Sequence, residues 1–182
     1  MLGTSPDTMN ESEVRESPLL GGAELAQRLI ELRTLDLEAA RALDNAVAAV
    51  RAHRPDLVTG LERLREGHEA SASILEKLIA REGAEPPSVE HVFPGYLIGG
   101  MFALREEVGA EGVLRALCTN ETLLTATFEA SLYWPIDDET RICLESLSFN
   151  EQSRKEAVMG LLARAKISPL RQSRAHVRPI RS

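Results

Sequence analysis

Residues 24–50 read ELAQRLIELRTLDLEAARALDNAVAAV, and this stretch decides the fold. One row of residues recurs in it at alternating steps of four and three, and all but one of its members are apolar: Leu25, Leu29, Leu32, Asp36, Ala39, Leu43, Ala46 and Val50. This spacing is typical of the inward face of a long helix in a bundle. A carboxylate on that face costs free energy unless a charged or hydrogen-bonding group meets it. Asp36 is therefore the first candidate site residue.

Composition favours a helical domain. The chain has 182 residues, of which 43% are hydrophobic and only 4% aromatic, and it suits one domain with tails. A net charge of −7 argues against a general nucleic-acid binder. Two cysteines without a CxxC pair, no apolar run long enough to cross a bilayer and no secretory signal lead us to expect a cytoplasmic protein without a membrane partner.

Proline-containing breaks divide the chain into four expected helices. These helices cover about 23–53, 55–81, 112–133 and 138–166, and the breaks are Arg54-Pro55, Pro86-Pro87, Trp134-Pro135 and Ser168-Pro169. The very short first connection predicts an antiparallel hairpin. Residues 84–112 are rich in glycine and predict a long crossover that holds one short helix. The pattern therefore predicts an all-α four-helix bundle of two antiparallel hairpins joined by a crossover.

The ends of the chain differ from the bundle at 23–166. Residues 1–22 are rich in Ser, Pro, Gly and acids and predict a flexible tail. Residues 167–182 carry four arginines and no acid, which predicts a basic flexible tail. This second tail has two interpretations, a solvated end or a docking peptide for a protein partner.

Polar residues interrupt the apolar row near the middle of every expected helix. The second helix has His68 and Ser71, the third has Glu121, and the fourth has Glu151 and Arg154. For the fourth helix a phase through Ser148, Gln152 and Lys155 is an alternative. A mid-helix layer of polar residues around one axis is the arrangement of a metal site in a bundle core.

The stretches LDLEAARALDNAV (35–47) and LREGHEASASILEKLIAREGAEPP (64–87) resemble helices of the ferritin-like superfamily, in particular a rubrerythrin-like bacterial branch of unknown function that is often linked to stress. The resemblance covers about 24–165. It implies a ferritin-like bundle in which four helices supply, in order, one ligand, a pair, one ligand and a pair.

The residues depart from that ligand pattern. No Glu stands three positions before any His of this chain, so both Glu-x-x-His pairs of the family are absent. His68 and Ser71 take the places of one pair, and Arg154 replaces the histidine of the other. Arginine stays protonated and does not coordinate cations.

Three interpretations of the polar layer follow. In the preferred one, an ion-pair cluster of Asp36, Glu121 and Glu151 with Arg154 and protonated His68 replaces the metal, and the protein needs no cofactor. In the second, a set of four side chains holds one Fe, Mn or Zn ion: Asp36, His68, Glu121 and Glu151. In the third, the acids lie at the solvent-exposed edge of the helix interfaces, and Glu151 and Arg154 form an ordinary ion pair on the surface.

We therefore expect a ferritin-like protein without a functional di-metal centre, which acts as a structural or interaction module with a link to stress. No catalytic residues are expected. The alternative is a metalloprotein that oxidises or stores iron, with ferroxidase-like activity. The resemblance also implies a homodimer.

Overall fold

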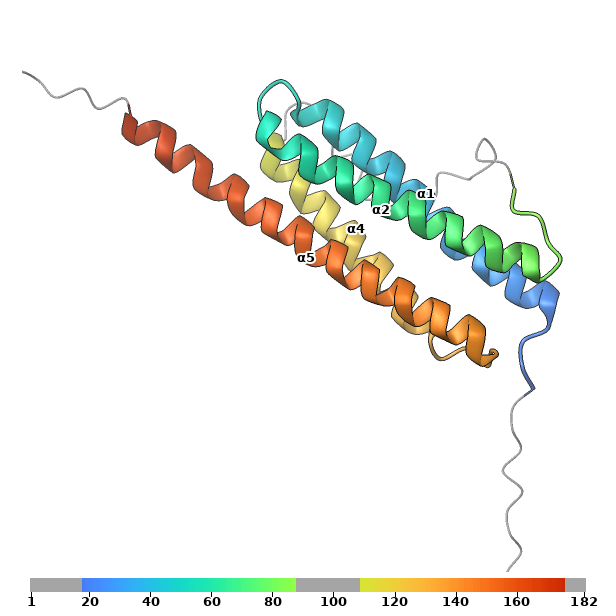
Figure 1. Ribbon diagram of the computed structural model, residues 1–182. Coiled ribbons are helices and arrows are strands. Elements are labelled where there is room, and N and C mark those ends of the chain that lie inside the picture. The colour runs from blue at the N-terminus through green and yellow to red at the C-terminus, as the bar shows by residue number, and fades with distance from the viewer. Residues whose placement is uncertain (1–17, 88–108, 176–182) are drawn as a thin grey trace, which may run out of the picture.

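The computed structural model describes residues 18–87 and 109–175. In the second segment, side chains are described up to residue 166 and the backbone alone from there to residue 175. In this part the chain forms four α-helices: α1 (Gly22–Val50), α2 (Pro55–Arg81), α4 (Gly109–Ser131) and α5 (Asp138–Ala175). Figure 1 shows them as a bundle of long, nearly aligned helices. The sequence-based prediction of an all-α four-helix bundle is confirmed.

The helices form two hairpins, because α1 packs chiefly on α2 and α4 packs chiefly on α5 (Figure 1). The core has two hydrophobic clusters, one toward each end of the bundle. One joins the end of α1, the starts of α2 and α4, and the later part of α5. The other joins the start of α1, the end of α2, the end of α4 and the start of α5. The end of α2 and the start of α4 therefore lie at opposite ends of the bundle.

Local sequence sets the helix ends at the two connections on one side of the bundle. Asp137 caps α5, because its Oδ1 accepts a hydrogen bond from the Thr140 backbone N–H at 2.9 Å. After α2, Gly83 adopts a φ of +77°, a left-handed conformation that favours glycine. The Gly83 N–H then bonds to Ala80 O and the Ala84 N–H to Ile79 O, which closes the helix end. Aspartate before a helix and glycine after one are residue types that these cap positions favour.

The predicted end of the last helix is wrong. We expected it to stop at Ser168-Pro169, but α5 continues to Ala175. Proline at 169 cannot donate the helical hydrogen bond to the carbonyl of Ala165. In the fold, Nη1 of Arg54 donates to that carbonyl at 3.4 Å. A partner that lies 111 residues away in sequence thus satisfies the acceptor that the proline leaves open.

Several expectations concern residues outside the described ranges. The crossover at 88–108 with its short helix, most of the tail at 1–22 and residues 176–182 of the basic tail belong to this group. They stay predictions. Within the described helices, none combines the length and apolar character needed to cross a membrane.

A buried polar layer as the candidate functional site

A layer of polar side chains lies between the two hydrophobic clusters. Each helix contributes at its middle, and every contributor is at most 8% exposed: Asp36 from α1, His68 and Ser71 from α2, Glu121 from α4, and Glu151 and Arg154 from α5. Helical periodicity explains this placement, because each polar residue occupies the same face as the leucines that flank it in sequence. The structure thus brings together all six residues that the sequence singled out.

His68 lies at the centre of the layer. Its Nδ1 is 2.8 Å from Oδ1 of Asp36, and its Nε2 is 3.2 Å from Oε1 of Glu121. Burial lowers the pKa of His68, but the hydrogen bonds to the two carboxylates outweigh this effect and raise the pKa to about 9. The imidazole is therefore protonated at neutral pH, and both ring nitrogens donate.

Arg154 supplies the second positive charge. Its Nε and Nη2 donate to the two carboxylate oxygens of Glu151, with Nε at 3.4 Å from Oε2. Nη2 also donates to Oγ of Ser71 at 3.0 Å and lies 3.9 Å from Oδ1 of Asp36. The guanidinium thus connects α5 with α2 and α1. A planar group with several donors suits this role, because it can hold two oxygens of one carboxylate at once.

Burial raises the pKa values of two carboxyl groups in the layer. Burial raises the pKa of Glu151 to about 7, and the nearby Asp36 adds to the rise, while His68 and Arg154 oppose it. Burial also raises the pKa of Asp36 against the lowering effect of His68 and Arg154. Near pH 7 the layer therefore holds a further proton on these two carboxyl groups for part of the time. With two cations and three acids, its net charge lies between −1 and zero.

Gly67 is a member of the site that the sequence analysis did not single out. A Cβ at this position would lie 3.2 Å from Nη1 and 3.4 Å from Cδ of Arg154. Glycine in a helix interior normally costs stability, so its presence here is explained by the room that the guanidinium needs. The available signal was a glycine next to His68 in the middle of an otherwise regular helix.

Arg33 and Asn120 are among the further polar residues that the fold buries and that the sequence does not mark. Arg33 on α1 is 4% exposed and donates through Nε and Nη2 to Oε1 of Glu76 at 2.8 and 2.6 Å. Asn120 on α4 is buried beside Glu121, and its Nδ2 has no hydrogen-bond partner in the described part of the chain. No local pattern marks Arg33, because its partner lies 43 residues away.

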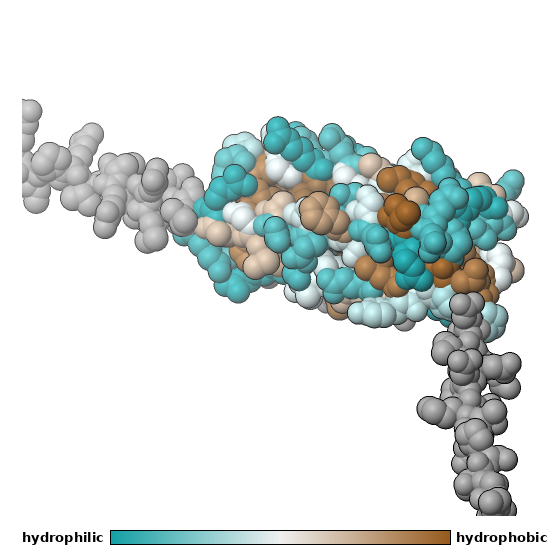
Figure 2. All heavy atoms as spheres, turned by 60° about the horizontal axis from the view of Figure 1, so that its bottom comes forward, coloured by the Kyte–Doolittle hydropathy of each residue, from teal (hydrophilic) through white to brown (hydrophobic). Residues whose placement is uncertain are grey.

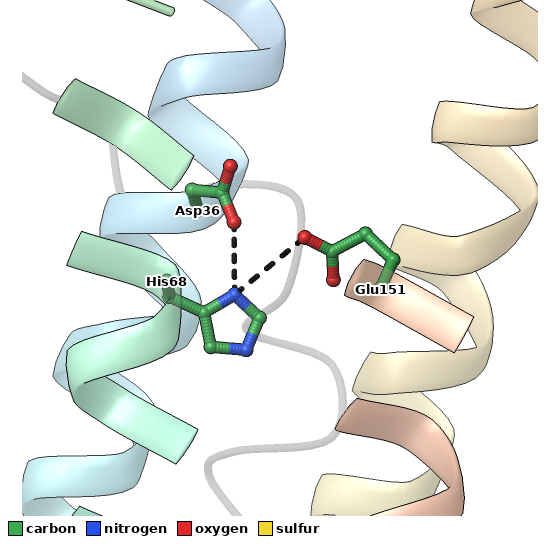
Figure 3. Close-up of side chains that lie close together, drawn as sticks. All are labelled: Asp36, His68 and Glu151. Atoms are coloured by element: carbon green, nitrogen blue, oxygen red, sulfur yellow. Dashed lines mark hydrogen bonds and ion pairs between the residues drawn. The ribbon is translucent and has the colours of Figure 1, made fainter. Parts of the chain in front are cut away.

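Three side chains have the composition of a metal site. Asp36, His68 and Glu151 each offer one ligand atom, and these atoms lie within 4.8 Å of one another. Figure 3 shows both carboxylates directed at the same nitrogen of His68. Within the described residues, Asp36 Oδ2 and Glu121 Oε2 are buried without a hydrogen-bond partner. Carboxylate and imidazole ligands suit Fe, Mn or Zn.

A two-metal centre does not fit this layer. The ferritin-like arrangement uses a Glu from each of two helices and a Glu-x-x-His pair from each of the other two. In this chain the residues three positions after His68 and Glu151 are Ser71 and Arg154, so neither helix has the histidine that such an arrangement requires. Moreover, Nη2 of Arg154 donates to Oε1 of Glu151 and lies 3.9 Å from Oδ1 of Asp36, so the guanidinium is next to two of the three residues that could hold a metal. Repulsion between the guanidinium and a divalent ion opposes binding at the same point.

Comparisons with protein-family models, with curated proteins and with solved structures find no match for this chain. The geometry of the buried layer is therefore the main guide to the function of this chain.

Proposed function

We propose that this chain is a ferritin-like bundle whose metal chemistry has been replaced by a fixed ion-pair cluster, so that it acts as a structural and interaction module. The observation that carries the proposal is the position of Arg154. Its guanidinium lies between Glu151, Ser71 and Asp36, in the middle layer of the bundle where members of the ferritin-like superfamily hold metal ions. The cluster then gives the two hairpins a defined register instead of a reactive centre.

Two further features support the ferritin-like assignment. The six residues of the layer come from the four helices in the order one, two, one, two, which is the order of the family's ligands. In addition, the end of α2 and the start of α4 lie at opposite ends of the bundle, as a long connection between two hairpins requires.

Metal analysis tests this proposal. Protein purified without chelator from iron- and manganese-supplemented cells should contain far less than one metal ion per chain. It should also not accelerate oxygen consumption by ferrous iron. Bound metal at one equivalent, or stoichiometric iron oxidation, contradicts the proposal.

The geometry offers a matched pair of variants. Arg154→His places an imidazole three residues after Glu151, which is the spacing of the family's ligand pair. This variant should gain binding of Mn²⁺ or Zn²⁺, seen as a rise in melting temperature with added ion. Arg154→Lys keeps the positive charge and should show no such rise. If both variants and the natural protein respond equally, Arg154 does not control access of metal to the layer.

The second candidate function is a mononuclear Fe or Mn protein that oxidises or stores iron. The specific observation in its favour is the cluster of ligand atoms within 4.8 Å, together with the unpartnered oxygens of Asp36 and Glu121 in the described part of the chain. Asp36, His68 and Glu151 would hold the ion, and the side chain of Arg154 would have to turn away. Binding of one Fe²⁺ or Mn²⁺ by the natural protein, lost in Asp36→Asn, supports this candidate.

A further inference from the structure

One side of the bundle is formed by α2 and α5, and Figure 1 shows it toward the viewer. On α2, a row of residues seven positions apart lies along this side: Gly60, Gly67, Ile74 and Arg81. A Cβ on Gly60 would lie 2.8 Å from Cδ2 of Leu161, and a Cβ on Gly67 would lie 3.2 Å from Nη1 of Arg154. The row therefore faces α5, and we call it, together with Arg154 and Leu161, the α2–α5 face.

The guanidinium of Arg154 reaches solvent at this face. Its Nε and Nη2 donate to Glu151 and Ser71, whereas Nη1 makes no hydrogen bond within the described residues. Nη1 is not among the fully buried atoms that lack a partner. The side chain of Arg154 is 10% exposed, while those of His68 and Glu151 are 0% exposed. Because Gly67 has no side chain, one donor of the buried cluster is left open toward the surface.

Three exposed basic residues border the α2–α5 face: Arg63 and Lys77 on α2, and Arg164 on α5. Each stands three positions after a residue that faces the opposite helix, so it lies at the edge of the face. None of the three makes an ion pair within the described residues. Their charges are therefore available to a partner.

Acidic residues lie at the two ends of this face, and both already have partners. Oδ2 of Asp56 is 2.8 Å from Nη2 of Arg54, and Oε2 of Glu139 is 3.2 Å from Nη1 of Arg81. Glu66 stands one row further from α5. From position 63 to position 77, over about 21 Å of helix, the face itself therefore carries only basic charge. This is the reverse of the chain as a whole, whose net charge is −7.

Apolar side chains adjoin these basic residues. Ile74 on the face is 37% exposed. On α5, Ile142 at 65% and Phe149 at 73% stand four and three positions from Ser146, which precedes Arg154 by two steps of four. Figure 2 shows hydrophobic surface on the face that the α4–α5 hairpin presents, more of it in the half where α5 begins. A partner that neutralises the basic residues therefore also finds apolar surface to bury beside them.

We propose that the α2–α5 face binds an acidic segment of a partner protein. One carboxylate of the segment accepts a hydrogen bond from Nη1 of Arg154 beside Gly67, and others lie near Arg63 and Lys77. Apolar side chains of the segment pack on Ile74. This inference names the partner for the interaction role proposed above and rests on that role, because the outward donor exists only while the guanidinium stays fixed in the layer.

The arrangement of the charges favours this partner over other anions. A basic stretch of about 21 Å suits an extended segment with several carboxylates better than a single small anion. A guanidinium that other bonds already hold in place loses little freedom when it binds a carboxylate. Nucleic acid is disfavoured, since a chain with a net charge of −7 repels a polyanion of high charge density. The same face of a second copy would bring basic residues against basic ones.

Nuclear magnetic resonance titration of the full chain tests the proposal. The probe is a synthetic peptide of about 12 residues that repeats Glu-Glu-Leu, and the matched control peptide repeats Lys-Lys-Leu. With the acidic peptide, backbone signals of the α2–α5 face and the guanidinium signal of Arg154 should shift, while those of α1 and α4 that face away stay in place. Added salt should raise the dissociation constant. The basic peptide should cause no shifts.

A pair of charge variants makes the test specific to this face. Arg63→Glu/Lys77→Glu should raise the dissociation constant of the acidic peptide at least about tenfold. Arg41→Glu/Lys166→Glu makes the same charge change at exposed positions away from the face and should raise it by less than about threefold. All four positions are exposed, so both variants should fold like the natural protein.

Several results overturn the proposal. These are no shifts with the acidic peptide, shifts that lie outside the face, or equal effects of the two double variants. Inorganic phosphate that produces the same shifts at the same concentration, or duplex DNA that binds the face more tightly than the peptide, also overturns it. Failure of the proposed function is seen separately, as metal bound in the buried layer, whereas a metal-free protein that does not respond to the peptide contradicts this inference alone.

Discussion

Nη2 of Arg154 lies 3.9 Å from Oδ1 of Asp36, the same oxygen that meets Nδ1 of His68 at 2.8 Å. A single carboxylate oxygen on α1 therefore faces two cations, one on α2 and one on α5. This relationship places two positive charges near one oxygen of Asp36, which is 0% exposed. It explains how an acid is accommodated in the middle of an apolar row.

Removal of Arg154 should destabilise the bundle. Arg154→Leu leaves Glu151 and Asp36 without their guanidinium partner, and the loss of one member of a buried ion pair typically costs about 3–5 kcal/mol. Urea denaturation measures the change in the free energy of unfolding. Arg164→Leu, at an exposed position of the same helix, should change it by less than about 0.5 kcal/mol.

The double variant Arg154→Leu/Glu151→Leu provides the matched control for this prediction. Replacing both partners by apolar groups removes the unpaired charge, so the double variant should be more stable than Arg154→Leu alone. If Arg154→Leu keeps the melting temperature of the natural protein, the guanidinium is not part of a buried cluster.

Stability should fall as the pH rises. The pKa of His68 is about 9 in the folded state against an ordinary 6.5, so its stabilisation is complete below pH 6.5 and is lost as the pH rises through 9. Glu151 acts in the same direction, because its pKa rises from 4.5 to about 7 on folding. Between about pH 6 and 9.5 we expect the free energy of unfolding to drop by on the order of 3 kcal/mol.

Chemical denaturation at several pH values across this range measures how the free energy of unfolding depends on pH. His68→Gln should lose most of the pH dependence above pH 7, whereas His53→Gln, at an exposed position, should keep it. If the free energy of unfolding of His68→Gln depends on pH as steeply as that of the natural protein, groups other than His68 cause the pH dependence. Nuclear magnetic resonance of the imidazole then shows directly whether His68 titrates near 9.

Gly67→Ala should destabilise the protein even though alanine is the better helix former. The new methyl group would lie 3.2 Å from Nη1 of Arg154, and the contacts to Ser71 and Glu151 prevent the guanidinium from moving away. In the Arg154→Leu background the same change should instead stabilise by about 0.5–1 kcal/mol, as helix propensity dictates. Equal effects of Gly67→Ala in both backgrounds contradict the close contact.

Loss of the α5 cap should have a moderate effect. Asp137→Ala removes the acceptor of the Thr140 N–H, and such a change typically costs about 1 kcal/mol. Asp137→Asn should retain most of the stability because its side-chain oxygen can still accept. Asp138→Ala, an exposed neighbour without a cap contact, serves as the control in thermal unfolding.

Sequence periodicity was enough to predict the four helices and the residues of the polar layer. Asp36, Glu121 and Glu151 each interrupt a row of leucines, so the burial of the leucines fixes the burial of the acid. The structure decides between the two phases of the last helix: Glu151 and Arg154 are both buried, whereas on the alternative row Ser148 is buried but Gln152 and Lys155 are only partly so.

Contacts between residues far apart in sequence were beyond prediction. Arg54 donates to the Ala165 carbonyl that Pro169 leaves open, and Glu76 accepts from the buried Arg33. Proline predicts a helix end from local chemistry alone, and a distant donor that satisfies the open carbonyl has no local signature. The role of Gly67 likewise follows only once Arg154 is placed against it.

The most direct test of the account is a crystal structure of the protein grown with ferrous iron or manganese, with diffraction recorded at the absorption edge of the metal. We predict no anomalous peak in the buried layer, with the guanidinium of Arg154 in contact with Ser71 and Glu151. An anomalous peak between Asp36, His68 and Glu151, with Arg154 turned away from them, contradicts the account.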